Sequence, residues 1–409
     1  MTADLLRTDH HVHSTWSDDA VSSTWANLAT ARDAGLASVR MVDHVRTSTT
    51  YVPEFLAEVA ALPRVEGLEV LTGVEAKILD ASGRLDVPGV LLSIVALGGL
   101  VYGIIRGGEG AGWTTPGVLV PLLGGIALLA LFIQLQRRSA HPALDVSLFR
   151  NPAFSAAAAA LGLNFFALLG ATFYVVFYLQ GVLGYSPLQA GATLIPVALG
   201  MAIMGPRSSV LAERYGAKAV CAVGFALITT SFLGFQLLDA ESPAWLLIVI
   251  LSVQGTGMGM VMAPATESIM SVVPREKAGA GAAVNNSVRQ VGGALGVAIL
   301  GSVLAGVYTA NLGDATDVLP AEVREQAGES IVSTLQAVGR VQAGDDPEAA
   351  AAAAGLVQPA REAFVDAMHV TAVGTAAAGA IAVVVVLVWL PGRRDRVTGP
   401  TGAGTGRAG

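Results

Sequence analysis

The first residues able to do chemistry are histidines and carboxylates near the N-terminus. His11 and His13 stand two apart in the run DHHVHS, so on a strand both side chains would share one face. Asp18 follows in the next loop, and the apolar runs VRMVDHV and LEVLTGVEAK carry His44 and Glu75 near their ends. Mixed imidazole and carboxylate ligands suit zinc, manganese or iron. These five residues predict a metal site.

Three short runs, read as strands, must position these ligands. They cover about residues 9–14, 39–45 and 68–77, and a helix-like segment, 22–36, separates the first two. Strands that alternate with helical segments are typical of βαβ units. The sequence therefore predicts a small α/β unit that delivers its ligands at strand ends.

A second group of candidate residues lies in an apolar stretch nearer the C-terminus. Arg289 stands there with Asn285, Asn286 and Gln290 nearby in the chain. A charge inside a membrane is costly and faces a bundle interior or a water-filled cavity. We expect Arg289 to clamp a neighbouring helix or snorkel from the cytoplasmic end; a direct role toward substrate or protons is the alternative.

Further polar residues accompany this group within the apolar stretches. Glu267 is expected to pair with a basic loop residue rather than to carry a proton. Asn164, Gln180 and Gln254 would line a path or form hydrogen bonds between helices. No residue is assigned a catalytic role.

The composition argues against a soluble protein. Of 409 residues, 53% are hydrophobic and only 13% are charged, whereas soluble proteins carry about 25% charged residues. The net charge of −7 comes without a basic stripe, so no nucleic-acid partner is expected. The single Cys221 excludes an internal disulfide framework and a cysteine zinc site.

The apolar residues fall into eight segments, each near the roughly 20 residues that a membrane-crossing helix needs. Small residues recur along them, which favours close helix packing. The sequence predicts an all-α polytopic membrane protein of about eight spans, at about 89–106, 117–135, 154–180, 190–206, 219–238, 245–269, 284–308 and 364–390.

The basic residues predict the orientation of the spans. Lys and Arg are retained on the cytoplasmic side of a membrane. They lie between spans two and three, four and five, and six and seven, and after span eight, whereas the short loops 181–189 and 239–244 carry none. The span count is even and the sequence shows no signal-peptide pattern, so both termini are expected in the cytoplasm. The protein itself is expected in the plasma membrane. The residues concerned are Arg137, Arg138, Arg150, Arg207, Arg214, Lys218, Arg275, Lys277, Arg393, Arg394 and Arg396.

Two polar stretches interrupt or follow the spans. Residues 309–363 are expected to form an exterior loop with short surface helices, because helix-favouring residues are frequent there. Residues 391–409, rich in Gly, Thr and Ala, predict a disordered cytoplasmic tail.

The apolar part, 89–390, resembles the major facilitator superfamily, in particular its fourteen-span drug:proton antiporters. The run PATESIMSVVPREKAGAGAAVNNSVRQVGGALGVAILGSVL, residues 264–304, is similar to that family's twelfth and thirteenth spans. DVPGVLLSIVALGGLVYGII resembles its central extra spans, and HPALDVSLFRNPAFS the entry to its C-terminal half. GPRSSVLAERYGAK looks like the C-terminal copy of its loop motif and contains Gly205, Arg214 and Gly216.

The resemblance implies export of small amphipathic or drug-like compounds in exchange for protons. The proton gradient drives this export, and no cofactor is needed. It also implies that the chain corresponds to the last eight of fourteen spans. Such transporters bind substrate between two halves that rock about it. An incomplete transporter is therefore expected, which would need a partner chain to supply the missing half.

The N-terminal part resembles the PHP family of metal-dependent phosphoesterases, in a histidinol-phosphatase-like branch. DHHVHS is similar to its first motif, and VDHVRTSTTYVPEF and VLTGVEAKILDASGRLDVP to later ones. The resemblance implies that His11, His13, Asp18, His44 and Glu75 are ligands of a divalent metal in an incomplete site. Because the family's remaining motifs and more than half of its barrel are missing, no enzyme activity is expected.

Three parts are predicted: a truncated α/β PHP-barrel fragment at 1–88, a transporter portion at 89–390 and a tail at 391–409. An incomplete drug:proton antiporter is the favoured function. The alternatives are a metal phosphoesterase fragment tethered to the membrane, or a non-functional chimera of two truncated genes joined near Pro88.

Overall fold

The computed structural model describes residues 8–16, 21–45, 50–76, 86–139, 142, 144–273 and 278–392. Asp18, the basic residues Arg275, Lys277, Arg393, Arg394 and Arg396, and all but the first two residues of the predicted tail lie outside them. The chain divides into two compact units, Met1–Val87 and Pro88–Gly409.

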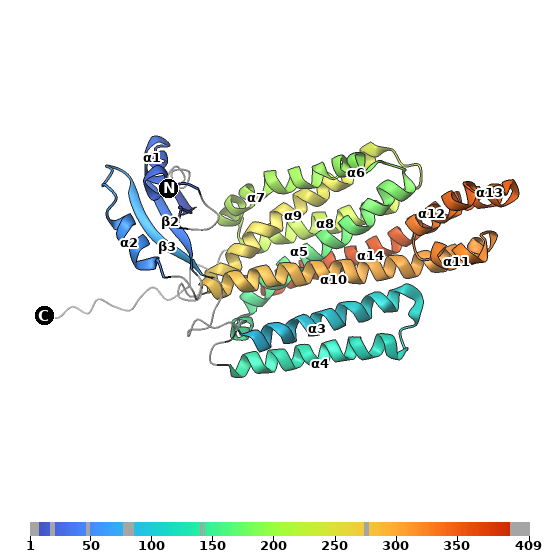
Figure 1. The fold of residues 1–409 in the computed structure, drawn as a ribbon, viewed down its shortest axis with the longest axis horizontal. Helices are drawn as coiled ribbons and strands as arrows, with labels where there is room; N and C mark the ends of the chain where they lie inside the picture. Colours follow the sequence, from blue (N-terminus) through green and yellow to red (C-terminus); the bar gives the residue numbers. More distant parts are fainter. Residues whose placement is uncertain are drawn as a thin grey trace. The chain divides into compact units, whose positions relative to one another are not determined.

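The N-terminal unit contains a parallel sheet whose strand order follows the chain (Figure 1). Its strands are β1 (Thr8–Val12), β2 (Ser38–Val45) and β3 (Glu69–Ala76). The crossovers are α1 (Thr24–Asp33) and α2 (Val52–Ala60). The predicted βαβ pattern is therefore present.

A small apolar core holds this unit together. Leu28 of α1 and Phe55 of α2 pack with Val39 and Met41 of β2. At the start of α1, the side chain of Ser23 accepts a hydrogen bond from the amide of Ala26 and so satisfies a free helix donor.

The expected truncated barrel is not evident in this unit. The described strands form an open sheet of three, β1-β2-β3. A small barrel closes with about eight strands, and three cannot tilt and stagger far enough to meet. The described residues thus form an open α/β layer.

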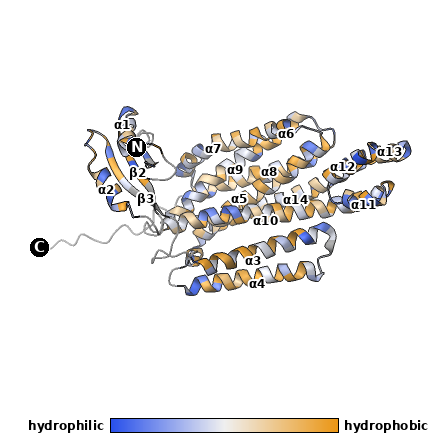
Figure 2. Cartoon of the chain, viewed as in Figure 1, coloured by the Kyte–Doolittle hydropathy of each residue, from blue (hydrophilic) through white to orange (hydrophobic). Residues whose placement is uncertain are grey.

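The C-terminal unit is a helical bundle. Eight helices or helix pairs among its described residues are long and apolar enough to cross a membrane, as the sequence predicts. Figure 2 shows that these helices consist mostly of hydrophobic residues, whereas the short helices near one end of the bundle are more hydrophilic. The long helices are α3 (Val87–Arg106), α4 (Pro116–Arg138), α5 (Pro152–Phe177), α6 (Pro187–Thr193) followed by α7 (Ile195–Tyr215), α8 (Ala217–Gly234), α9 (Ala244–Val272), α10 (Ala278–Leu312) and α14 (Val357–Trp389).

Two of the spans end in a wider π-helical turn. These turns cover Gly107–Ala111 after α3 and Tyr178–Val182 after α5. Gly110 in the first has a φ of 83°, which a residue without a Cβ adopts at little cost. The extra backbone width changes the direction in which the chain leaves each span.

The predicted loop between spans four and five is mostly helix. Arg207 and Arg214 lie on α7 and Lys218 lies on α8, with one residue, Gly216, between the two helices. Gly216 has a φ of 90°, a left-handed conformation that favours glycine at a helix end. The fourth span therefore runs nine residues further than expected, and the connection is a single-residue corner.

Three short helices occupy much of the predicted exterior loop. They are α11 (Ala321–Ala327), α12 (Ile331–Gln342) and α13 (Pro347–Ala354). Helix α14 begins at Val357, seven residues before the predicted start of span eight. Tyr308 of α10 and Thr334 of α12 form a buried hydrogen bond of 2.6 Å, which ties this segment to the bundle.

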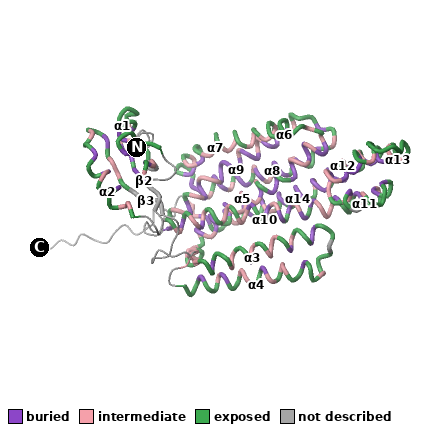
Figure 3. Tube along the Cα trace, viewed as in Figure 1, coloured by how far each residue is buried: buried purple, intermediate pink, exposed green. Residues whose placement is uncertain are grey.

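The helices differ widely in how much of their surface is covered (Figure 3). In the most apolar stretch of α9, 56% of the residues are buried, and in that of α5 44% are. The corresponding value for the α6–α7 span is 6%, and for α3 and α4 it is 17% each. The core is thus built by α5, α8, α9, α10 and α14, while α3, α4 and α7 lie outside it.

Candidate functional site

Small residues bring α5 and α10 into backbone contact. A Cβ added to Gly292 would lie 2.3 Å from the carbonyl oxygen of Gly162, and one added to Gly296 2.3 Å from that of Phe166. Lipid gives helices no hydrophobic drive to associate, so close packing of this kind holds them together. This crossing positions the polar residues of α10.

Arg289 lies on α10 beside this crossing, over an aromatic ring of α5. The central carbon of its guanidinium is 4.5 Å from the centroid of Phe165. A cation over a ring face is attracted by the quadrupole of the ring, more strongly where water is scarce. The contact joins α10 to α5. The roles that the sequence suggests for Arg289, as a clamp between helices or toward substrate or protons, stay predictions.

The amides near Arg289 divide between the interior and the surface. The carbonyl oxygen of the Asn285 side chain is buried and has no hydrogen-bond partner. Asn286 and Gln290, by contrast, are exposed on the same helix. The structure therefore does not gather the four residues of this group around one point.

Two more amides are buried in the bundle without partners. Neither side-chain polar atom of Asn164 on α5 is hydrogen-bonded, and the oxygen of Gln254 on α9 is also unpaired. Both residues are almost fully buried. Buried amides are nearly always hydrogen-bonded to protein or water. These groups therefore have unused capacity to bind water or a polar ligand.

The residues of the predicted loop motif have mainly local roles. Gly205 has open space where a side chain would be, and Gly216 makes the corner between α7 and α8. The Arg214 guanidinium lies 5.3 Å from the ring centroid of its neighbour Tyr215. Glu267 is exposed and forms no ion pair with a described residue. Arg275 and Lys277, the basic residues of the loop that follows it, lie outside the described residues.

The predicted metal ligands are only partly described. The backbone places His11 on β1, His44 on β2 and Glu75 on β3, and His44 pairs with Glu75 in the parallel register. Of the five ligands, only His13 has a described side chain. Among the described residues, no group of three or more His, Cys, Asp or Glu side chains could hold a metal. The metal site stays a prediction.

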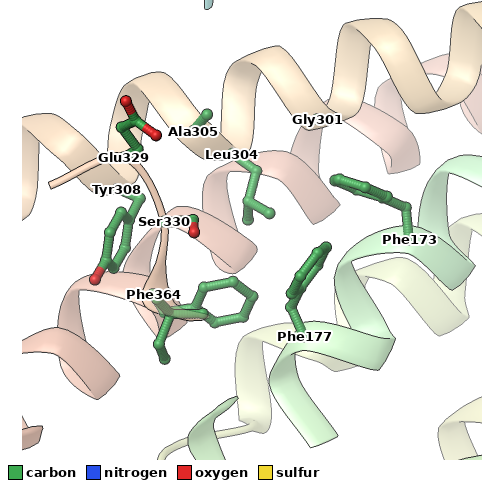
Figure 4. Close-up of a pocket in the computed structure, with 10 residues that line it drawn as sticks. Phe173, Phe177, Gly301, Leu304, Ala305, Tyr308, Glu329, Ser330 and Phe364 are labelled. Atoms are coloured by element: carbon green, nitrogen blue, oxygen red, sulfur yellow. The ribbon is translucent and has the colours of Figure 1, made fainter. Parts of the chain in front are cut away.

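A pocket that the sequence did not predict lies at the C-terminal ends of α5 and α10 (Figure 4). Its volume is about 90 Å³. The walls come from α5, α10, the start of α14 and the turn before α12, with Phe173, Phe177, Gly301, Leu304, Ala305, Tyr308, Glu329, Ser330, Ile331 and Phe364. Phe173 and Phe177 stand four residues apart, so the sequence could have shown that they share one face of a helix. The other lining residues are distant in the chain, so their meeting there could not be read from the sequence. About twelve residues of α10, or roughly 18 Å, separate this pocket from Arg289.

Comparisons with known proteins agree with this architecture. The Major Facilitator Superfamily profile matches residues 84–297. Multidrug resistance protein Stp of Mycobacterium tuberculosis is 35% identical over 239 residues, which are 58% of this chain and 44% of that protein. The tetracenomycin C resistance and export protein of Streptomyces glaucescens is 33% identical over 266 residues, 65% of this chain and 48% of that protein.

Other proteins are similar to a comparable share of the chain. Puromycin resistance protein pur8 of Streptomyces alboniger is 35% identical over 245 residues, 56% of this chain and 46% of that protein. A solved structure of a bacterial homolog of the human lysosomal transporter Spinster aligns with 72% of this chain and with 68% of its own chain. Its identity is 18% and its TM-score 0.44, below the level that defines a shared fold.

The chain spans about half the length of the curated relatives it matches. The profile match covers more than half of the chain and lies almost wholly on its membrane helices. The eight long apolar helices indicate a multi-pass membrane protein, and the chain belongs to the Major Facilitator Superfamily.

Proposed function

We propose that this chain exports drug-like small molecules as the C-terminal, eight-span portion of a fourteen-span, proton-coupled antiporter. The printed names of its relatives include multidrug, tetracenomycin C and puromycin resistance. The motifs in residues 264–304 and 205–218 support the fourteen-span type. Transport needs no cofactor in this proposal, and the proton gradient supplies the energy.

The uncovered face of the bundle is the observation that supports a missing half. Only 6% of the most apolar stretch of the α6–α7 span is buried, although α9, against which α7 packs, is the most covered helix. On α10, Asn286 and Gln290 are exposed within a membrane span. Polar side chains in a membrane face other helices or water rather than lipid. A partner chain that supplies a second half would cover this face.

The polar residues then have separate proposed roles. Arg289 holds α10 against α5 by its contact with Phe165. Asn286 and Gln290 would face the substrate path between the two halves. The Asn164 amide and the side-chain oxygen of Gln254 are buried without hydrogen-bond partners, and they would bind ordered water inside the bundle.

A reconstitution experiment tests this function. The chain is expressed alone, and together with the six N-terminal spans of a full-length relative such as Stp, and dye efflux from intact cells is measured. We expect efflux only in the paired sample, abolished by a protonophore. Efflux by the chain alone would refute incompleteness, and no efflux from a paired, correctly inserted sample would refute transport.

The proposed orientation places both termini in the cytoplasm, because the basic residues flank α4, α7 and α8 on one side. Single cysteines at Ser139 and Ser186, in a background with Cys221 replaced by serine, test it with an impermeant thiol reagent on whole cells. We expect labelling at position 186 and none at 139. The reverse pattern would contradict the orientation.

We further propose that the N-terminal unit is a fragment of a PHP-type metal protein. The cross-strand pairing of His44 with Glu75, and the position of His11 on β1, support it. Metal content of the purified chain is the test, with His11→Ala and His13→Ala as paired variants. Bound metal that both variants lose would support this origin; absence of metal, together with phosphate release no faster than buffer, would leave a plain α/β fragment.

A further inference from the structure

The pocket at the ends of α5 and α10 has walls made mainly of aromatic rings. Phe173 and Phe177 of α5 pair edge to face with centroids 4.9 Å apart. Tyr308 and Phe364 form a second such pair, 6.4 Å apart. Figure 4 shows the four rings on different sides of one space. A cation is attracted by the electron-rich face of an aromatic ring, so a pocket lined by several rings favours a cationic group.

Most polar groups around the pocket already form hydrogen bonds within the protein. The Tyr308 hydroxyl is hydrogen-bonded to Thr334, whose own hydroxyl also contacts the carbonyl of Ala327. The Ser330 hydroxyl interacts with that of Ser333 and accepts a hydrogen bond from its amide. The lining therefore presents ring and aliphatic carbon to an occupant, with little free hydrogen-bonding capacity.

Glu329 is the exception and supplies the only formal charge in the lining. It is exposed, and its carboxylate has no hydrogen bond or ion pair with any residue that the structure describes. Figure 4 shows it next to Ala305, at one side of the space. A carboxylate at the rim of a pocket lined by aromatic rings favours a positive occupant and disfavours an anionic one.

The size of the pocket limits what can enter. Its volume is about 90 Å³. An engineered cavity of about 150 Å³ holds a whole benzene molecule. This pocket therefore fits a compact group of a few heavy atoms, while exposed Phe173 and Glu329 mark where the rest of a larger molecule would leave.

We propose that this pocket binds a compact ammonium group with apolar substituents, held by the rings of Phe173, Phe177, Tyr308 and Phe364 and by the Glu329 carboxylate. The site lies apart from Arg289 and the exposed face of α10, and binding there does not require transport. The ammonium group could belong to a free solute or to a lipid headgroup.

Choline and its neutral analogue, in which carbon replaces the nitrogen, are the matched probes. Binding to the purified full chain is measured in nanodiscs of anionic lipid without choline. We expect choline to bind more tightly than the analogue. Discs of phosphatidylcholine separate the two sources: if the headgroup is the occupant, free choline binding is lost there, and if only the solute enters, it is retained.

Charge and volume variants complete the experiment. Glu329→Gln is expected to weaken choline about fivefold and to leave the neutral analogue unchanged, because it removes one partly solvated charge. Glu322→Gln, an exposed charge change on α11 outside the pocket, is the control and should have no effect. Ala305→Leu should fill the space and abolish binding of both probes; if that variant does not fold, Phe364→Leu should weaken choline more than the analogue.

Several outcomes would overturn the proposal. They are the absence of choline binding to the unchanged chain, equal binding of the two probes, or equal losses in Glu329→Gln and Glu322→Gln. Binding that persists in well-folded Ala305→Leu would also place the ligand elsewhere.

Discussion

The guanidinium of Arg289 on α10 lies 4.5 Å from the centre of the Phe165 ring on α5. The two helices are in backbone contact one turn away, where Gly292 meets Gly162. Arg289 is the only charged residue of α10, and it contacts a ring rather than a carboxylate. Such a contact keeps a charge in a membrane helix without an acidic partner.

Loss of the cation–ring contact should destabilise the bundle, and the effects of changing Arg289 and Phe165 should not be additive. Phe165→Leu and Arg289→Gln should each lower the free energy of unfolding, and the double variant should lose about 1 kcal/mol less than their sum. Thermal unfolding in detergent measures the cycle. Arg207→Gln, an exposed charge on α7, is the control. Strictly additive losses would show that the two side chains do not interact.

The glycine contact should tolerate no side chain. A Cβ at Gly292 would lie 2.3 Å from the Gly162 carbonyl oxygen, so Gly292→Ala must push α10 from α5. We expect a loss of about 2 kcal/mol or more. Gly374→Ala on α14, where no atom lies within 4 Å, is the matched control and should be neutral or slightly stabilising. Equal stability of the two variants would contradict the close crossing.

The hydrogen bond between Tyr308 and Thr334 should hold the α11–α13 segment on the bundle. Thr334→Val leaves the buried Tyr308 hydroxyl without its 2.6 Å partner, at a cost of about 1–3 kcal/mol. Adding Tyr308→Phe removes that hydroxyl and should recover part of the loss. Proteolysis of this segment and thermal unfolding measure the effect. No recovery in the double variant would mean that Thr334 acts only through Ala327 and Ser330.

The turn between α8 and α9 should make stability depend on pH. The pKa of Asp239 is lowered because its carboxylate accepts hydrogen bonds from the Glu241 amide, at 2.8 Å, and from the Ser242 hydroxyl, at 2.9 Å. A lowered pKa contributes stability above the ordinary carboxyl value, and this is lost as pH falls through the lowered one.

The same turn is joined to the bundle by hydrogen bonds, so a change in the turn should alter the stability of the whole bundle. The Tyr178 hydroxyl donates to the Asp239 carbonyl at 2.6 Å, and a ring nitrogen of His369 contacts the Leu238 carbonyl at 2.8 Å. Melting temperatures below about pH 4 should fall less in Asp239→Asn than in the unchanged chain, because an amide does not titrate. Parallel falls in the two proteins would rule out a contribution from Asp239.

The residue pattern predicted several features of the membrane part correctly. Eight helices follow from eight apolar stretches, because a helix must satisfy its own backbone wherever lipid offers no hydrogen bonds. The type and position of Arg289 also favoured a contact with a neighbouring helix, because a charge within a membrane span needs a partner; its role as a clamp stays a prediction. In the N-terminal unit, the alternation of strand and helix was sufficient to predict three parallel strands.

Other features depended on which helices meet in three dimensions. The sequence could not show that Arg289 meets Phe165, 124 residues earlier, or that Asn164 and Gln254 are buried without partners. The length of α7 was also missed, because charged residues near Pro206 read as a loop although the helix continues to a glycine corner.

By itself, the sequence determined the number of apolar spans, the α/β order of the N-terminal unit and the recurrence of small residues that allow helices to pack closely. Only the tertiary structure decided the pairing of α5 with α10, the uncovered face of α7 and the pocket closed by Ile331 and Phe364. The physical reason is range. Apolar length and backbone hydrogen bonding act within one helix, whereas a pocket exists only after side chains from distant segments have packed together.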